Sequence, residues 1–132
     1  MVIIPVPGRD HARHELRSTY VERCWLPVIG PTCVAFLRLC PDLWVLQAPY
    51  EAPDLDIAHM LGQGQGAKAR DVAKRLHRFR LAAWAPTTRT VRGRCLVPSL
   101  NAAQLERCPA PVRAIHNHLN LVTHLTQGDL AS

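Results

Sequence analysis

The sequence lacks any long hydrophobic run, which excludes a membrane-spanning helix. Although 48% of the residues are hydrophobic, no apolar stretch approaches the roughly 18 residues that such a helix needs. The first 17 residues, MVIIPVPGRDHARHELR, have no basic segment ahead of their apolar part, so they do not fit a signal peptide. We therefore expect a soluble, cytoplasmic chain of 132 residues that forms one domain and has no membrane partner.

The motifs of metal centres and of common active sites are also missing. There are five cysteines, an odd number, and no CxxC pair occurs. We therefore expect the cysteines to be small, buried hydrophobic residues of a protein in a reducing compartment. His116 and His118 are two residues apart, whereas zinc ligands on a helix favour spacings of three or four. No Ser/His/Asp or Cys/His pattern is evident. We expect no metal, no cofactor and no enzymatic activity.

A third absence concerns nucleotide-binding loops, although three glycines alternate between residues 62 and 66. A phosphate-binding loop of the Walker type needs Gly-Lys-Ser/Thr, but Lys68 follows an alanine and Ala69 has no hydroxyl. A dinucleotide fingerprint needs a buried strand before the glycines, and the preceding residues 54–61 have helical periodicity. The glycines therefore predict a turn between two helices.

The rest of the pattern predicts a mainly helical domain with three parts. These are a flexible N-terminal arm over 1–17, a core over 18–98, and C-terminal helices over 99–126. Prolines, caps and apolar spacing predict helices over 19–26, 31–41, 54–61, 67–79, 99–108 and 111–125. Pro41 is expected at or near the end of the second, and Ser99 is expected to cap the fifth. Residues 44–53 predict a brief strand and a loop.

After residue 80 the apolar residues recur at every second position, which is the period of a β-strand. Strands are predicted over 81–86 and 91–97, joined by a turn at Thr87–Thr90. Within the second strand, Arg92 and Arg94 alternate with small or apolar residues, so both are expected on one side. Of the three tryptophans, all expected in or near the core, only Trp84 lies close to the basic segment.

Positive charge is concentrated in one segment. From Gly66 to Arg94 there are nine Lys and Arg residues against the single acid Asp71, a local charge of +8 in a chain whose total is +6. The remainder is therefore slightly acidic. Such a confined basic segment is typical of a surface that binds phosphates, because an ordinary solvated face interleaves acids with bases.

Two helices joined by a glycine turn, with a basic second helix followed by a basic hairpin, resemble the winged helix-turn-helix superfamily over 32–98. More narrowly, the chain looks like the small winged helix proteins of high-GC bacteria. The resemblance implies a two-stranded β-wing and additional N- and C-terminal helices. It also implies that the recognition helix 67–79 enters the major groove and that the wing 82–97 lies on the backbone or in the minor groove.

The resemblance and the charge together indicate a set of DNA-binding side chains. Lys68 and Arg70 near the helix start are expected to reach base edges, and the later helix cations and the wing arginines to contact phosphates or the minor groove. The alternative for Arg80 is an ordinary exposed residue. The full set is Gln63, Gln65, Lys68, Arg70, Lys74, Arg75, Arg78, Arg80, Arg89, Arg92 and Arg94.

We therefore expect sequence-specific binding of double-stranded DNA in transcriptional control. Proteins that bind single-stranded nucleic acid need exposed aromatic residues interleaved with cations, and such residues are scarce here. One alternative is a nucleoid-associated protein or an accessory protein of replication or maintenance, and another is a winged helix that binds proteins. The apolar stripe over 111–125 either covers the core or forms a homodimer interface.

Overall fold

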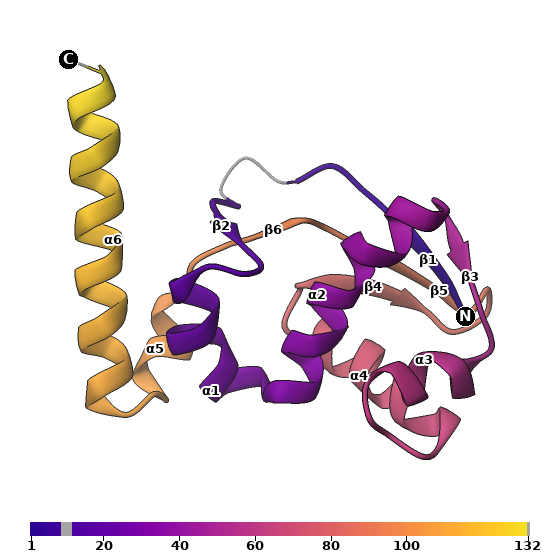
Figure 1. Cartoon of the computed structure of the whole chain (residues 1–132). Coiled ribbons are helices and arrows are strands. Elements are labelled where there is room, and N and C mark those ends of the chain that lie inside the picture. The colour runs from indigo at the N-terminus through magenta and orange to yellow at the C-terminus, as the bar shows by residue number, and fades with distance from the viewer. Residues whose placement is uncertain (9–11, 132) are drawn as a thin grey trace.

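The computed structural model describes residues 1–8 and 12–131, with the side chains of 122–131 left out of the description. The chain is mixed α/β and rich in helix, which agrees with the coarse expectation of a helical domain with a small sheet. Figure 1 shows the sheet and α2–α4 in one half of the molecule, with α6 at the opposite end. None of the described helices is both long enough and apolar enough to cross a bilayer.

The helices follow the predicted order closely. A turn of π-helix, η1 (Val21–Trp25), leads into α1 (Leu26–Ile29). The remaining helices are α2 (Pro31–Leu46), α3 (Asp54–Met60), α4 (Gly66–Arg78), α5 (Ala102–Glu106) and α6 (Ala110–Ala131). Helix α2 continues through Pro41 to Leu46, beyond its predicted end. The residues after Pro41 gain contacts from this, because Leu43 is buried and Trp44 donates a hydrogen bond to the Ile3 carbonyl.

A four-stranded sheet has the order β3-β1-β5-β4. Its strands are β1 (Val2–Pro5), β3 (Tyr50–Glu51), β4 (Ala82–Ala85) and β5 (Thr90–Gly93). The register places Ile3, Trp84 and Val91 side by side on one face, and all three are buried. Helix α2 covers this face so closely that a Cβ at Gly93 would lie 3.2 Å from the Trp44 ring. The helices thus pack on one face of the sheet.

The prediction of a flexible arm over 1–17 is wrong for its first residues. Strand β1 lies in the middle of the sheet, parallel to β5 and antiparallel to β3, and Ile3 is completely buried. A second short strand, β2 (His14–Glu15), pairs with β6 (Leu96–Val97). The physical reason is that strand pairing satisfies backbone groups through distant partners, which local sequence patterns do not reveal.

The predicted second wing strand is interrupted. Strand β5 ends at Gly93, and β6 belongs to a separate two-stranded sheet, so Arg92 and Arg94 do not lie on one continuous strand. The hairpin between β4 and β5 turns at residues 86–89, one residue before the predicted turn at Thr87–Thr90. The expected two-stranded wing is thus part of a larger sheet that includes β1 and β3.

The glycines between α3 and α4 meet different structural requirements. Gly62 adopts a left-handed φ of 75° just after α3, a conformation that glycine tolerates without strain. Gly66 begins α4 against the first turn of α3, where a Cβ would lie 3.2 Å from the Leu55 nitrogen. Gly64 has neither constraint. The segment is therefore a helix-to-helix turn, as its sequence indicates.

The C-terminal helices pack on the N-terminal part of the core. Asn101, rather than Ser99, caps α5, and its side chain forms a reciprocal capping box with Gln104. The described part of the α6 stripe, Val112, Ile115 and Leu119, faces the core. The rest of the stripe, Val122 and Leu125, lies outside the described side chains.

Candidate nucleic-acid interface

Helix α4 has an apolar back and a cationic front. Ala69, Val72, Ala73 and Leu76 are buried against the core. On the opposite side, residues 67, 71, 74 and 78 follow the three-to-four spacing of one helix face, and all are exposed. This stripe carries Lys74 and Arg78 together with Asp71. The front of α4 is therefore open to solvent along its whole length.

A hollow continues this cationic front at the C-terminal end of α4. It has a volume of about 440 Å³ and is bounded by α4, the start of β4 and the segment after β5. We call it the basic hollow, and its lining consists of His77, Arg78, Arg80, Ala82, Ala83 and Arg94. No hydrogen bond or ion pair joins the side chain of Arg78 or Arg80 to another described residue. Their guanidinium groups are therefore available to an anion.

Two other expected cations are held by a buried acid. Asp54, the first residue of α3, has only 6% of its side chain exposed, and Arg70 donates to its Oδ2 at 2.7 Å. Arg89, in the hairpin turn, binds the same oxygen, and the amino group of Met1 lies 3.3 Å from Oδ1. Burial alone would raise the Asp54 pKa, but the hydrogen bonds from both arginines outweigh it and lower that pKa.

Arg75 also has internal partners. Its Nε donates to the Ile29 carbonyl and its Nη2 to the Val28 carbonyl, each at 3.0 Å, so it ties α4 to the end of α1. Beside it, Lys68 and Gln63 line a groove of about 320 Å³ that reaches Gly30 at the start of α2. Arg75 thus fixes the position of α4, whereas Lys68 is exposed.

The remaining expected residues are separated from the front of α4. Arg92 is exposed on the sheet face opposite to the helices, next to Ala83 of β4. Gln65 is exposed in the turn before α4, where it makes no side-chain cap. The structure therefore places Lys74 and Arg78 on one face of α4, and Arg78, Arg80 and Arg94 around the basic hollow, and it does not bring all nine cations onto one surface. Arg94 Nε also donates to the Pro7 carbonyl at 3.3 Å.

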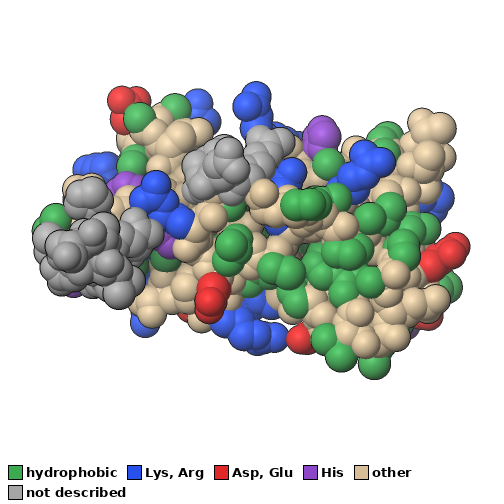
Figure 2. All heavy atoms as spheres, turned by 90° about the horizontal axis from the view of Figure 1, so that it is seen from above, with side chains coloured by type: hydrophobic (Ala, Val, Ile, Leu, Met, Phe, Trp, Pro, Cys, Tyr) green, Lys and Arg blue, Asp and Glu red, His purple; other side chains and the backbone are tan. Residues whose placement is uncertain are grey.

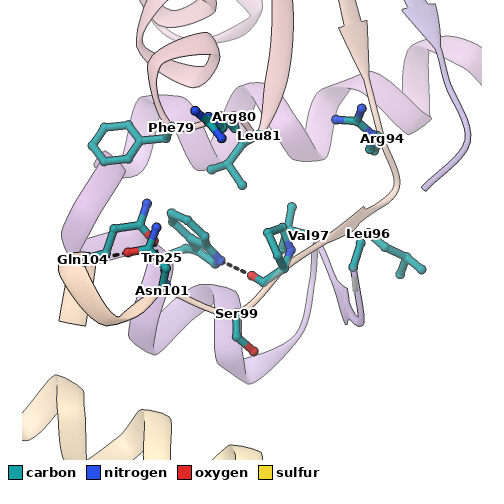
Figure 3. Close-up of a pocket in the computed structure, with 12 residues that line it drawn as sticks. Trp25, Phe79, Arg80, Leu81, Arg94, Leu96, Val97, Ser99, Asn101 and Gln104 are labelled. Atoms are coloured by element: carbon teal, nitrogen blue, oxygen red, sulfur yellow. Dashed lines mark hydrogen bonds between the residues drawn. The ribbon is translucent and has the colours of Figure 1, made fainter. Parts of the chain in front are cut away.

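A second concavity borders the basic hollow and shares Arg80 and Arg94 with it. We call it the Trp25 pocket, and it has a volume of about 300 Å³. Figure 3 shows Phe79, Arg80, Leu81 and Arg94 along one side and Trp25, Val97 and Ser99 along the other. The Trp25 indole donates to the Pro98 carbonyl at 2.7 Å. The Ser99 hydroxyl points away from the pocket (Figure 3), so the pocket does not present it as a nucleophile.

A buried polar cluster connects η1, β2 and α6. The rings of His14 and Tyr20 stack with centroids 3.8 Å apart, and His14 Nε2 lies 2.7 Å from the Ser99 hydroxyl. The Tyr20 hydroxyl lies 2.6 Å from His116 Nδ1 and accepts the Leu100 N–H. Burial, with Arg13 nearby, lowers the His14 pKa to about 4, and burial raises the Tyr20 pKa to about 12. These groups are therefore uncharged at neutral pH.

Other candidate residues fall into the core. Cys24, Cys33, Cys40 and Cys108 are buried, as predicted, whereas Cys95 is exposed. Among the described residues, no group of three His, Cys, Asp or Glu side chains is arranged to hold a metal ion. Sequence reasoning missed Asp54 as the partner of Arg70 and Arg89. Its only local signal was an acid at the first turn of a helix, which also occurs as an ordinary dipole-stabilising residue.

Comparisons with protein-family models, with curated protein sequences and with solved structures found no match to this chain.

Proposed function

We propose that the chain binds double-stranded DNA through the front of α4 and the basic hollow, and that it acts in transcriptional control. The observation that carries the proposal is the continuity of Lys74 and Arg78 on α4 with Arg80 and Arg94 around one concave surface. A helix front flanked by guanidinium groups suits a groove and its phosphates. None of the described residues that line the basic hollow is an acid.

The element order supports the same proposal. Helix α2, strand β3, helices α3 and α4 and the β4–β5 hairpin follow one another as in the winged helix resemblance, with α4 as the recognition helix. The sheet differs from the simple wing, because β1 lies between β3 and β5. Since Arg70 and Arg89 bind Asp54, we assign them to holding the hairpin turn beside α4 rather than to reading bases.

The test measures affinity for a random-sequence duplex by fluorescence anisotropy at several salt concentrations. The double variant Lys74→Gln/Arg78→Gln removes two exposed cations from the interface. We expect weaker binding and a plot of log K against log salt whose slope is smaller by about 2. The matched control, Arg23→Gln/Arg107→Gln, removes the same charge from exposed positions on η1 and after α5. Equal losses in both variants would contradict the proposal.

Sequence preference needs a separate measurement. Selection of bound duplexes from a random pool, followed by competition with excess unrelated DNA, separates a regulator from an accessory protein. A regulator retains one short site under competition, whereas a nucleoid-associated or maintenance protein is displaced.

The dimer expected through 111–125 stays a prediction, and sedimentation equilibrium at micromolar concentration tests it.

One observation favours the alternative of a protein-interaction module. Val45 and Leu46, at the end of α2, are 85% and 75% exposed. Figure 2 shows hydrophobic side chains gathered over the half of the molecule that holds the sheet and the end of α2. Exposed apolar patches of this kind often contact other proteins. Under this alternative, Val45→Ser/Leu46→Ser abolishes partner binding, and the α4 variant described above leaves it unchanged.

A further inference from the structure

We propose that His77 contacts a backbone phosphate of the bound duplex as a neutral hydrogen-bond donor, beside Arg78 and Arg80 in the basic hollow. This inference rests on the proposed function and deepens it. The sequence gives no local signal for His77, because a single histidine in a basic helix has no distinctive spacing. Its role follows from the hydrogen bonds at the end of α4.

Strand β4 sets the tautomer of His77. The Nδ1 atom of His77 accepts the backbone N–H of Trp84 at 3.1 Å. Since β4 is the last strand of the sheet, this bond satisfies a backbone donor at the sheet edge. Because Nδ1 accepts, the proton of the neutral imidazole is on Nε2. One nitrogen of His77 therefore stabilises the fold, and the other is an N–H donor.

The end of α4 presents several donors without internal partners. His77 is exposed and lines the basic hollow. Within the described part of the chain, no hydrogen bond or ion pair engages its Nε2 or the guanidinium groups of Arg78 and Arg80. Arg94 lines the same hollow but donates to the Pro7 carbonyl, so we assign no role to it. A phosphate suits such a cluster, because its oxygens accept from several donors at once.

Arg80 occupies a position at which helices usually have glycine. Its φ is 59°, its N–H donates to the His77 carbonyl, and the Leu81 N–H donates to the Leu76 carbonyl, each at 3.0 Å. These two bonds form a Schellman motif, whose left-handed residue is strained when it carries a Cβ. We attribute the arginine to the guanidinium group that it brings to the hollow. The same bonds occupy two of the last carbonyls of α4, which lessens their repulsion of an anion.

Two substitutions separate the structural bond of His77 from the proposed contact. His77→Asn keeps an acceptor near the position of Nδ1 but has no donor near Nε2. We expect an unchanged Tm and a duplex affinity that is lower by about five- to tenfold. His77→Gln has a donor near Nε2 but no acceptor for the Trp84 N–H, so we expect a lower Tm and an affinity within about twofold of the wild type.

The matched control is His59→Asn, at an exposed position on α3, which should change neither Tm nor affinity. Undiminished affinity in folded His77→Asn would overturn the proposal. If His77→Asn does not fold, Ala83→Glu places a carboxylate in the lining of the hollow and should cause at least the same loss of affinity. Full affinity in that variant would also reject the contact.

The salt dependence distinguishes a neutral donor from a cation. At about pH 8, where histidine is ordinarily neutral, His77→Asn removes no positive charge. The slope of log K against log salt should therefore equal that of the wild type, whereas Lys74→Gln/Arg78→Gln reduces it by about 2. A slope that is smaller by about 1 in His77→Asn would show a charged histidine and reject the neutral donor.

Arg80 is tested through the opposite signs of its two effects. Arg80→Gly relieves the left-handed backbone and removes the guanidinium group. We expect a higher Tm together with a duplex affinity that is lower by about tenfold. Arg80→Gln is the control, because it keeps the Cβ and should weaken binding without raising Tm. A higher Tm with full affinity would mean that the guanidinium group does not contact the phosphate.

NMR signals of the His77 ring nitrogens test the contact independently of duplex binding. We expect the wild-type protein to carry its proton on Nε2, and the Nε2 signal to shift when inorganic phosphate or duplex is added. A proton on Nδ1 instead rejects the proposal. A shift with inorganic phosphate but no binding of duplex rejects the proposed function and keeps the phosphate site. Duplex binding that leaves the His77 signals unmoved rejects the site and keeps the proposed function.

Discussion

The Asp54 carboxylate at the start of α3 binds the Arg89 guanidinium in the turn between β4 and β5. This contact joins two segments that are 35 residues apart in the sequence. Because Arg70 of α4 binds the same oxygen, Asp54 connects both helices of the helical pair to the hairpin. A single buried acid thus sets the position of the hairpin turn relative to α4.

Replacement of Asp54 by Asn is expected to destabilise the fold by about 2 kcal/mol at neutral pH, because charge-assisted hydrogen bonds from Arg70 and Arg89 are lost. The folded-state pKa of Asp54 is lowered, so its contribution is present above the usual aspartate range and is lost as pH falls through the lowered pKa. Urea unfolding of both proteins at neutral and acidic pH checks this. A difference in stability that does not shrink in acid would contradict it.

The close approach of α3 and α4 at Gly66 gives a second prediction. Gly66→Ala places a methyl group about 3.2 Å from the Leu55 backbone nitrogen and 3.3 Å from Asp54 Cβ, neither of which moves freely. We expect a loss of about 1 kcal/mol or more, seen as a lower Tm. Gly64→Ala is the matched control, because nothing lies within 4 Å of the added Cβ, and its Tm should stay the same or rise slightly.

The buried His14 predicts a loss of stability in mild acid. Its pKa falls from the usual 6.5 to about 4 on folding, so the unfolded chain binds the proton more readily between these values. The contribution of His14 to the free energy of unfolding is fully present above pH 6.5. It decreases by about 3 kcal/mol as the pH falls toward 4. His14→Gln should flatten this dependence. His118→Gln, at an exposed position, should leave the slope as in the wild type.

The Tyr20 hydroxyl gives a related prediction that does not depend on pH. It accepts the Leu100 N–H at 2.8 Å and lies 2.6 Å from His116 Nδ1, in a buried position. Tyr20→Phe leaves both groups without this partner, at an expected cost of about 2–3 kcal/mol. Denaturant unfolding measures the change, and a cost near zero would mean that water replaces the hydroxyl.

Arg75 and Lys74 are neighbours in sequence with opposite expected roles. Arg75→Gln removes two hydrogen bonds to the end of α1, so we expect it to lower Tm by the equivalent of about 1–2 kcal/mol. Lys74→Gln is expected to weaken duplex binding without changing Tm, because Lys74 is exposed on the α4 front. Measurement of Tm and duplex affinity for both variants checks this, and a reversal of the two effects would refute the assignment.

Local patterns were sufficient for the central part of the fold. The predicted helix over 67–79 differs from α4 by one residue at each end, and the turn after β4 is likewise shifted by one residue from its predicted position. Periodicity and glycine placement decide these features, and both act over a few residues. The four buried cysteines and the core positions of Trp25 and Trp84 follow from their hydrophobicity.

The sequence by itself therefore determined the helical pair, the hairpin and the basic character of the segment that contains them. Only the tertiary structure decided that β1 enters the sheet. It also decided that Arg70 and Arg89 bind Asp54 and that Arg75 donates hydrogen bonds to carbonyls of α1. It also brought Arg80 and Arg94 together at the border of two concavities. The physical reason is distance along the chain, because strand pairing and ion pairing join residues whose separation leaves no periodic trace in the sequence.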